Sequence, residues 1–174
     1  MKFKIKKPEK AKHTDIVNGA TWISNNNCFT VSDDNTIMSW NTLTDATNKI
    51  STLDNSYLDI DCFPNSRSNS DFVAIAGANG SIKLITKLGK IEKTVANAHT
   101  GSITALKWSS DGAGLASCGE DGCVKIWSKN GELRSKICEY PDPIYSLAWS
   151  PDCNSVCITK KDSLEIIPIT TSNS

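Results

Sequence analysis

The stretch Ala98–Ser128 reads AHTGSITALKWSSDGAGLASCGEDGCVKIWS. It holds three short apolar runs, and each run is bounded by Gly, Ser or Asp residues. Such a pattern predicts three strands joined by tight turns. His99 stands 22 residues before Asp121, which in turn stands six residues before Trp127. This frame of His, Asp and Trp decides the fold prediction, because it recurs elsewhere in the chain.

A second copy of the frame lies at His13–Asn41, which reads HTDIVNGATWISNNNCFTVSDDNTIMSWN. Here His13 stands nine residues before Trp22, and Asp34 stands six residues before Trp40. The same intervals hold in the stretch quoted first, and a hydroxyl residue stands four residues before each Asp. The two matched sets are His13, Thr30, Asp34 and Trp40, and His99, Ser117, Asp121 and Trp127.

Two weaker copies of the frame lie at Tyr57–Thr86 and Pro143–Pro168. They keep the apolar runs, but Ile85 and Ile167 stand in place of the second Trp. Over all four copies the first aromatic residue falls at positions 22, 63, 108 and 149, at intervals of 41, 45 and 41 residues. Repeats of this length, built of four short strands, are typical of the blades of a β-propeller. The sequence therefore predicts an all-β chain of about four four-stranded antiparallel blades.

The two full copies of the frame resemble the WD-repeat family. In that family an Asp in a turn accepts a hydrogen bond from a His. The His reaches a Ser or Thr hydroxyl, and that hydroxyl accepts the indole N–H of a Trp. The resemblance gives the two matched sets these structural roles. The dipeptide that names the family is altered, since Trp40 is followed by Asn41 and Trp127 by Ser128. The second and fourth copies lack the His and the second Trp, so we expect them to rely on apolar packing alone.

The repeats divide the chain into blades at 12–53, 56–96, 98–138 and 140–169, followed by a polar tail at 170–174. Before them, Phe3 and Ile5 alternate with lysines, which predicts a half-buried strand at 2–7. Rings of this kind usually need about seven blades, so four blades predict an incomplete ring. We expect a fragment or an incomplete gene product, in which the strand at Lys2–Lys6 lacks the last blade that it would complete.

Four phrases outside the shared motif carry a narrower resemblance. In order they are SDDNTIMSWN, ITKLGKIEKTVANAH, GEDGCVKIWSKNGELRS and PIYSLAWSPD. The set resembles the N-terminal part of a WD-repeat subunit of intraflagellar transport complex B. This resemblance implies a non-catalytic interaction scaffold in cilium assembly and anterograde transport. It also implies other complex B subunits and the remainder of the propeller as partners, and the cytoplasm, cilium and ciliary base as location. The alternative is a WD-repeat adaptor of another large assembly, such as a vesicle coat.

Composition bears on two other classes of function. The formal net charge is zero, which argues against a nucleic-acid partner, because phosphate binding needs a basic surface. A basic arm at Lys2–Lys12 that binds nucleic acid or a membrane surface is the second class considered. The longest run of apolar and small residues, Phe72–Ala78, is too short to cross a bilayer. We therefore expect no membrane insertion, and the lysine-rich start predicts no signal peptide.

An enzyme with a site in the central channel is the third class considered. No GxSxG, HExxH or P-loop pattern occurs, and both histidines fall on the repeat frame. We therefore expect no catalytic residue, no cofactor and no metal. In the acid pairs Asp33-Asp34 and Glu120-Asp121, we expect one carboxylate to be buried in the turn and the other to point outward. The seven cysteines form no CxxC pair, which predicts reduced, structural thiols.

Overall fold

The computed structural model describes residues 12–64 and 72–169. The predicted strand at 2–7 and the tail at 170–174 lie outside these residues. The described residues form fifteen strands and no helix. The strands are β1 (Val17–Trp22), β2 (Asn27–Ser32), β3 (Thr36–Asn41), β4 (Thr47–Thr52), β5 (Tyr57–Cys62), β6 (Phe72–Gly77), β7 (Ile82–Thr86), β8 (Ile91–Val95), β9 (Ile103–Trp108), β10 (Leu115–Gly119), β11 (Cys123–Trp127), β12 (Leu133–Glu139), β13 (Ser146–Trp149), β14 (Ser155–Lys160) and β15 (Ser163–Pro168).

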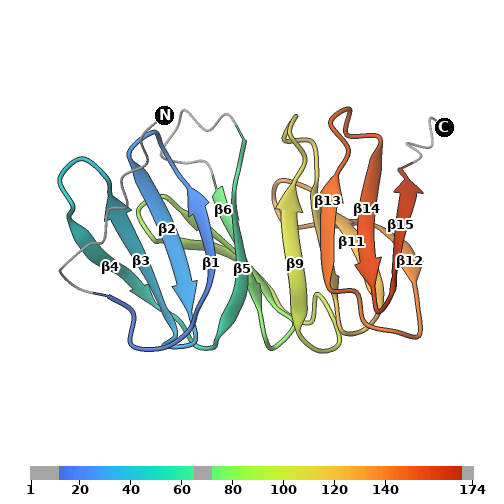
Figure 1. Ribbon diagram of the computed structural model, residues 1–174, viewed down its shortest axis with the longest axis horizontal. Coiled ribbons are helices and arrows are strands. Elements are labelled where there is room, and N and C mark those ends of the chain that lie inside the picture. Colours follow the sequence, from blue (N-terminus) through green and yellow to red (C-terminus); the bar gives the residue numbers. More distant parts are fainter. Residues whose placement is uncertain (1–11, 65–71, 170–174) are drawn as a thin grey trace.

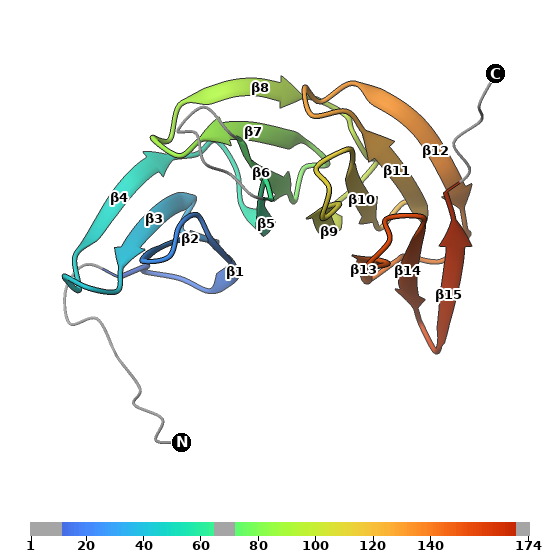
Figure 2. The same ribbon diagram turned by 90° about the horizontal axis from the view of Figure 1, so that it is seen from above.

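The strands form four separate antiparallel sheets, each a meander of consecutive strands. Blade 1 is β1–β4, blade 2 is β5–β8, blade 3 is β9–β12 and blade 4 is β13–β15. The four blades stand side by side in Figure 1, and Figure 2 shows them arranged around an open arc. The first strand of each blade lines the inside of the arc, and β4, β8 and β12 lie on its outside. The prediction of an all-β propeller with an incomplete ring is therefore confirmed.

Blade 4 departs from the predicted four strands. Its sheet order is β13-β14-β15, whereas each of the other blades has a fourth strand. The described chain ends at Ile169, one residue beyond β15. The described part of blade 4 thus has three strands, because no described residues remain to form a fourth, whereas the other three blades have the predicted four strands.

The hydrophobic core lies between successive blades, in three clusters that each join two neighbours. The apolar stretch FVAIAG of β6 shows the consequence, since Val73 and Ile75 face blade 1 while Ala74 and Ala76 face blade 3. Strands buried on both faces read as continuous apolar runs. The outer strand β8, IEKTV, is largely exposed and polar. The fully buried members of the clusters include Phe29, Ile37, Ile60, Ile85, Leu84, Leu106, Leu115, Ile144 and Ile158.

The turns after the two motif Asp residues need a left-handed backbone. Asn35 has a φ of 60° and Gly122 a φ of 68°. Asn and Gly are the residues that adopt this region most readily. A Cβ atom on Gly122 would lie 1.9 Å from the carbonyl oxygen of Tyr140, so only glycine fits there. These turns join β2 to β3 and β10 to β11, and each motif Asp lies in its turn.

Candidate functional site

The His99 set forms a continuous hydrogen-bonded chain across blade 3. His99 Nδ1 lies 2.9 Å from Asp121 Oδ1, and His99 Nε2 lies 2.7 Å from Ser117 Oγ. The indole N–H of Trp127 donates to the same Ser117 Oγ over 2.8 Å. His99 is 3% exposed and Ser117 is fully buried. The structure therefore brings together four residues that the sequence separates by up to 28 positions.

One protonation state satisfies every bond of this chain. Burial lowers the pKa of His99 and outweighs the raising effect of Asp121, so the imidazole is neutral at pH 7. Neutral His99 donates from Nδ1 to Asp121 and accepts the Ser117 hydroxyl proton at Nε2. Burial opposes the charge of Asp121, but hydrogen bonds from His99 and from the N–H of Thr100 and Cys123 hold its pKa below the ordinary value. A buried carboxylate with this many donors stays ionised.

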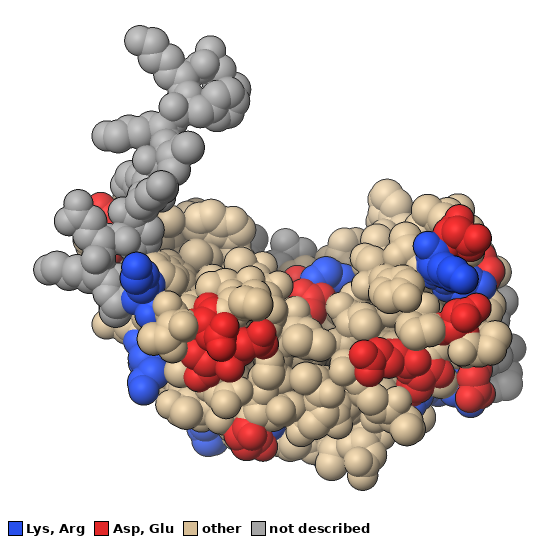
Figure 3. Space-filling model, turned by 60° about the horizontal axis from the view of Figure 1, so that its bottom comes forward, with Lys and Arg blue, Asp and Glu red and all other residues tan. Residues whose placement is uncertain are grey.

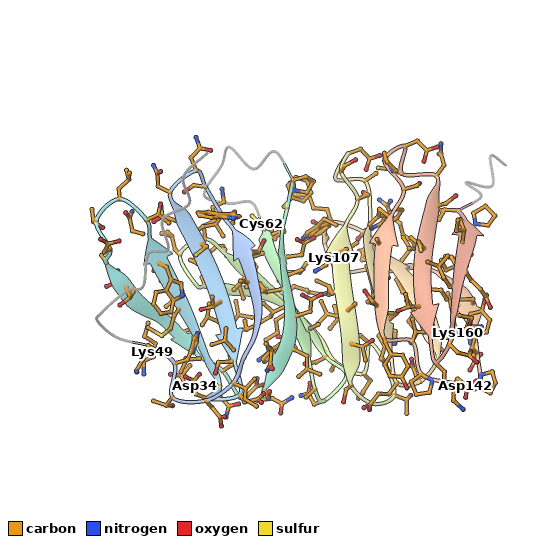
Figure 4. The ribbon with its side chains drawn as sticks, in the orientation of Figure 1. Asp34, Lys49, Cys62, Lys107, Asp142 and Lys160 are labelled. Carbon is orange, nitrogen blue, oxygen red and sulfur yellow. The ribbon has the colours of Figure 1, made fainter. Side chains whose placement is uncertain are left out.

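Blade 1 contains the same chain of contacts. His13 Nδ1 lies 2.9 Å from Asp34 Oδ2, and His13 Nε2 lies 2.7 Å from Thr30 Oγ1. The indole N–H of Trp40 donates to Thr30 Oγ1 over 2.8 Å. Figure 4 shows Asp34 at the lower end of its sheet, in the turn between β2 and β3. The Thr36 hydroxyl adds a 2.6 Å bond to Asp34, and the pKa of Asp34 lies well below its ordinary value because these donors outweigh burial.

The surroundings of the two sets differ. In blade 3, Trp108 and Trp127 pack in the cluster shared with blade 2 and are 6% and 4% exposed. In blade 1, the corresponding Trp22 is 60% exposed and Trp40 is half-buried. No described blade covers that face. An open groove runs along it, lined by Trp22, Cys28, Thr30, Trp40, Asn41, Thr42 and Asp45.

Blade 2 replaces the His–Asp link with an ion pair, so the expectation of apolar packing alone is wrong. Asp54 stands nine residues before Phe63, at the position of the motif His. It accepts a 2.6 Å hydrogen bond from Lys83 Nζ and a 3.2 Å bond from the hydroxyl of Tyr57. Lys83 is the second residue of β7 and is 5% exposed. In the sequence, the feature that indicates this contact is the lysine within the otherwise apolar run SIKLIT.

Blade 4 also places a polar contact where apolar packing alone was expected. Tyr140 stands nine residues before Trp149, and its hydroxyl donates to Glu165. That bond raises the pKa of Tyr140 to about 12. Lys160 donates to the same carboxylate over 2.5 Å and lies 3.6 Å above the centre of the Tyr140 ring. Both divergent blades thus join the residue at the His position to the third strand.

The inner strands of blades 2 and 3 are joined by carboxylates that the sequence did not single out. Asp59 accepts the backbone N–H of Leu106 over 3.0 Å and the Lys107 ammonium over 2.8 Å. Asp61 accepts the backbone N–H of Trp108 over 2.8 Å, and burial raises the pKa of its carboxyl group. These contacts connect β5 of blade 2 to β9 of blade 3. In Figure 4, Lys107 lies between the inner strands of blades 2 and 3.

One of the two acid pairs departs from the expectation, whereas in the other Glu120 is exposed beside the largely covered Asp121. Asp34 and Asp121 belong to the two sets, but Asp33 does not simply point outward. It accepts hydrogen bonds from Asn18 over 2.7 Å and from Ser56 over 2.5 Å, and Ser56 precedes the first strand of blade 2. Asp33 therefore connects blade 1 to blade 2.

Figure 3 shows acidic side chains gathered in groups on the lower side of the molecule. Among residues 12–64 and 72–169, no three His, Cys, Asp or Glu side chains are grouped so that they could hold a metal.

The structure joins none of the seven cysteines in a disulfide, and Cys118 and Cys123 are buried. Burial raises the pKa of the Cys118 thiol to about 12. A thiol with so high a pKa is a poor nucleophile. Within the described residues, no helix is long and apolar enough to cross a membrane.

Comparison with known families agrees with this geometry. The model of the family described as "WD domain, G-beta repeat" matches residues 7–41 and 89–128. The chain contains WD40 repeats. The two matched segments hold the complete His13 and His99 sets. The WD40 match does not extend to most of blade 2 or to blade 4, where Asp54 and Tyr140 replace the His.

Two curated relatives match almost the whole chain. They are the intraflagellar transport protein 80 homologs of Mus musculus and Rattus norvegicus, each 38% identical over 176 residues. The alignments cover 97% of this chain and 22% of each relative, so this WD40 chain spans about a fifth of the length of those proteins. A human F-box-like/WD repeat-containing protein is also 38% identical, but over 65 residues, or 37% of the chain.

Proposed function

We propose that this chain is a non-catalytic WD40 scaffold, and that it serves as the N-terminal propeller portion of an intraflagellar transport complex B subunit. In that role it acts in cilium assembly and anterograde transport, in the cytoplasm, the cilium and the ciliary base. The observation that carries the proposal is the extent of the similarity to the intraflagellar transport protein 80 homologs. It covers 97% of the chain and therefore includes blades 2 and 4, which lack the WD40 frame.

The geometry supports a scaffold rather than a catalyst. Both histidines are held between an Asp and a hydroxyl at the same spacing in two blades. A general base must reach a substrate in a cleft with a free lone pair, and neutral His99 uses both ring nitrogens within the protein. Each blade instead holds its connecting loops at the rim of a rigid sheet, which is the usual way in which such a fold presents binding residues.

The test is affinity purification of the tagged chain from ciliated cells at about 0.1 M and about 0.5 M salt. We expect complex B subunits to co-purify equally at both concentrations, because phosphate-driven binding falls steeply with salt whereas packed protein interfaces do not. Recovery of vesicle-coat subunits instead would favour the alternative adaptor role. Recovery of nucleic acid at low salt alone would contradict the scaffold proposal.

A matched variant separates the folded blades from the basic arm. In it, Lys2, Lys4, Lys6 and Lys7 are replaced by Gln. The scaffold proposal predicts unchanged recovery of complex B subunits, since the described blades are intact. Loss of all partners on this change would assign the binding to the arm and overturn the proposal.

A further inference from the structure

The chain contains three Asn-Gly pairs, at Asn18-Gly19, Asn79-Gly80 and Asn130-Gly131. An Asn that precedes Gly is prone to spontaneous loss of its side-chain amide, because glycine has no side chain to hinder attack by its own backbone nitrogen. In this reaction the Asn side chain must turn toward the next peptide nitrogen. Hydrogen bonds that hold the side chain therefore decide which of the three pairs reacts.

Two of the pairs lie in the same kind of turn. Asn79 is the third residue of the turn at 77–81, and Asn130 is the third residue of the turn at 128–132. In each turn the N–H of the first residue donates to the carbonyl of the fifth over 2.8 Å, and the N–H of the fourth donates to the carbonyl of the first over 3.1 and 3.0 Å. The fourth residue is glycine in both, with a φ of 76° and 75°. Both asparagines are exposed, so their side-chain contacts distinguish the two pairs.

The side chain of Asn79 is held by the fifth residue of its turn. Its Oδ1 atom accepts the backbone N–H of Ser81 over 3.1 Å and the hydroxyl of Ser81 over 2.7 Å. The carbonyl oxygen of Gly80 also accepts the backbone N–H of His99 over 3.0 Å, which fixes this turn to blade 3. Attack on Asn79 therefore requires two side-chain hydrogen bonds to break first.

The side chain of Asn18 is held as well. Asn18 lies within β1, and its Nδ2 atom donates to Asp33 over 2.7 Å and to the carbonyl oxygen of Tyr57 over 3.3 Å. The amide that would leave is thus the donor of both bonds, and this pair is also restrained.

Asn130 differs from both. Within residues 12–64 and 72–169 its side-chain amide makes no hydrogen bond, and only its backbone N–H donates, to Ser128 Oγ over 3.3 Å. Glu132 stands at the position that Ser81 occupies in the other turn. Its N–H donates to Ser128 Oγ over 3.1 Å instead of to the asparagine. The amide of Asn130 is therefore free to turn toward the nitrogen of Gly131.

We propose that Asn130 is a site of spontaneous deamidation, which gives a mixture of aspartyl and isoaspartyl residues in the β11–β12 hairpin. The backbone nitrogen of Gly131 loses its proton to water and attacks Cγ of Asn130. The bond between this nitrogen and Cγ forms, the bond between Cγ and Nδ2 breaks, and the amide leaves as ammonia with a proton from water. Water then opens the succinimide ring. Opening at Cγ gives aspartate, and opening at the backbone carbonyl gives isoaspartate, whose main chain runs through Cγ.

The reaction changes both the charge and the backbone of the hairpin. Each product carries a carboxylate next to Lys129 in place of a neutral amide. Isoaspartate also lengthens the main chain at a tightly packed turn, since a Cβ atom on Gly131 would lie 3.0 Å from Val95 Cγ2 of blade 2. The free carboxylate of isoaspartate is the group that L-isoaspartyl O-methyltransferases esterify with S-adenosylmethionine. An enzyme of this class is therefore the partner expected for the modified chain.

The first experiment follows the three asparagines by peptide mass spectrometry while the purified 174-residue chain is incubated at neutral pH and body temperature. Asn130 should be lost at least about tenfold faster than Asn79, because the two hydrogen bonds of Asn79 must break before it reacts. In the urea-unfolded chain the three pairs should react at similar rates, because these bonds are absent. Loss of Asn18 or Asn79 as fast as that of Asn130 in the folded chain would overturn the proposal.

A matched variant transfers the restraint of Asn79 to Asn130. Ser128→Gly with Glu132→Ser gives this turn the first and fifth residues of the turn at 77–81, and should slow the loss of Asn130 about tenfold. Circular dichroism confirms that the variant is folded, and Glu132→Ser alone replaces it if it is not. An unchanged rate in the folded variant would show that side-chain restraint does not select the site, and would contradict the proposal.

The third experiment detects the isoaspartyl product directly. The incubated chain is treated with an L-isoaspartyl O-methyltransferase and S-adenosylmethionine labelled in its methyl group. The native chain should take up the label, and the Asn130→Ser chain incubated in the same way should take up almost none. Equal labelling of the two chains would place the reaction at another residue and overturn the proposal.

Discussion

Blades 1 and 3 contain the same four hydrogen-bonded positions, yet among the described blades a neighbour covers only the set of blade 3. The contact distances agree closely, with 2.8 Å from each Trp indole to its hydroxyl. The exposure of the first Trp of each blade differs, since Trp22 is 60% exposed and its counterpart Trp108 is 6% exposed. The comparison teaches that the set is specified within one blade, whereas its burial depends on the blade before it.

The largest effect should come from removing the motif Trp. Trp127→Ala empties the cluster shared with blade 2 and should lower the free energy of unfolding by about 3 to 5 kcal/mol. Trp40→Ala should cost about half as much, because half-buried Trp40 has less packing to lose. Urea unfolding of the two variants measures both losses. Equal losses of unfolding free energy for Trp127→Ala and Trp40→Ala would contradict the difference in covering between blades 1 and 3.

Removing only the hydroxyl tests the hydrogen bonds of the sets. Ser117→Ala leaves the indole N–H of Trp127 and the Nε2 atom of His99 buried without a partner, which should cost about 2 kcal/mol. Thr30→Val is the matched change in blade 1 and should cost about 1 kcal/mol, because water can enter the open groove and replace the hydroxyl. A smaller loss of unfolding free energy for Ser117→Ala than for Thr30→Val, measured by urea unfolding, would contradict this account.

The pH dependence of stability tests the buried state of His99. Burial lowers its pKa, so the unfolded chain takes up this proton at a higher pH than the folded chain. The stabilisation is therefore present above the ordinary His pKa of about 6.5 and is lost as the pH falls through it, at no more than about 1.4 kcal/mol per pH unit. His99→Gln should remove this part of the slope between about pH 7.5 and 5.5. An unchanged slope would show that His99 titrates as it does in the unfolded chain.

The smallest effect is expected at the ion pair of blade 2. Lys83 pairs with Ile75 across the sheet as Met38 pairs with Thr30 in blade 1, so the two residues occupy matched positions. Lys83→Met should change the free energy of unfolding by less than about 1 kcal/mol, because Asp54 is largely exposed and returns to water. Thermal unfolding of the variant measures this change, and a loss greater than about 2 kcal/mol would make the pair a true substitute for the His–Asp link.

The sequence predicts what is local to a blade. His99 and Ser117 could be placed together because their spacing repeats in His13 and Thr30, and strand alternation then brings them to one face. Contacts between blades could not be placed in this way. The bond from Ser56 to Asp33 and the bond from Lys107 to Asp59 depend on how two sheets are set beside each other. Periodicity within one sheet carries no information about that placement.

The sequence does not reveal the polar contacts of blades 2 and 4 for a related reason. A search for His and Trp finds nothing at Asp54 or Tyr140, although both stand at the interval of the motif His. Their partners, Lys83 and Glu165, lie on the third strand rather than in the turn. The sequence signal for these contacts is a charged residue within an apolar strand. The partner of that residue follows only from the positions of β7 and β15 in the structure.

The exchange of the two indole protons with solvent tests the central comparison most directly. In the ¹⁵N-labelled chain, nuclear magnetic resonance follows the indole N–H groups of Trp40 and Trp127 separately. Both should be protected by their hydroxyl partners, with Trp127 exchanging at least about tenfold more slowly, since only its face is covered by a blade. Equal exchange rates would contradict the difference in covering, and a rapidly exchanging Trp127 would contradict the hydrogen-bonded set itself.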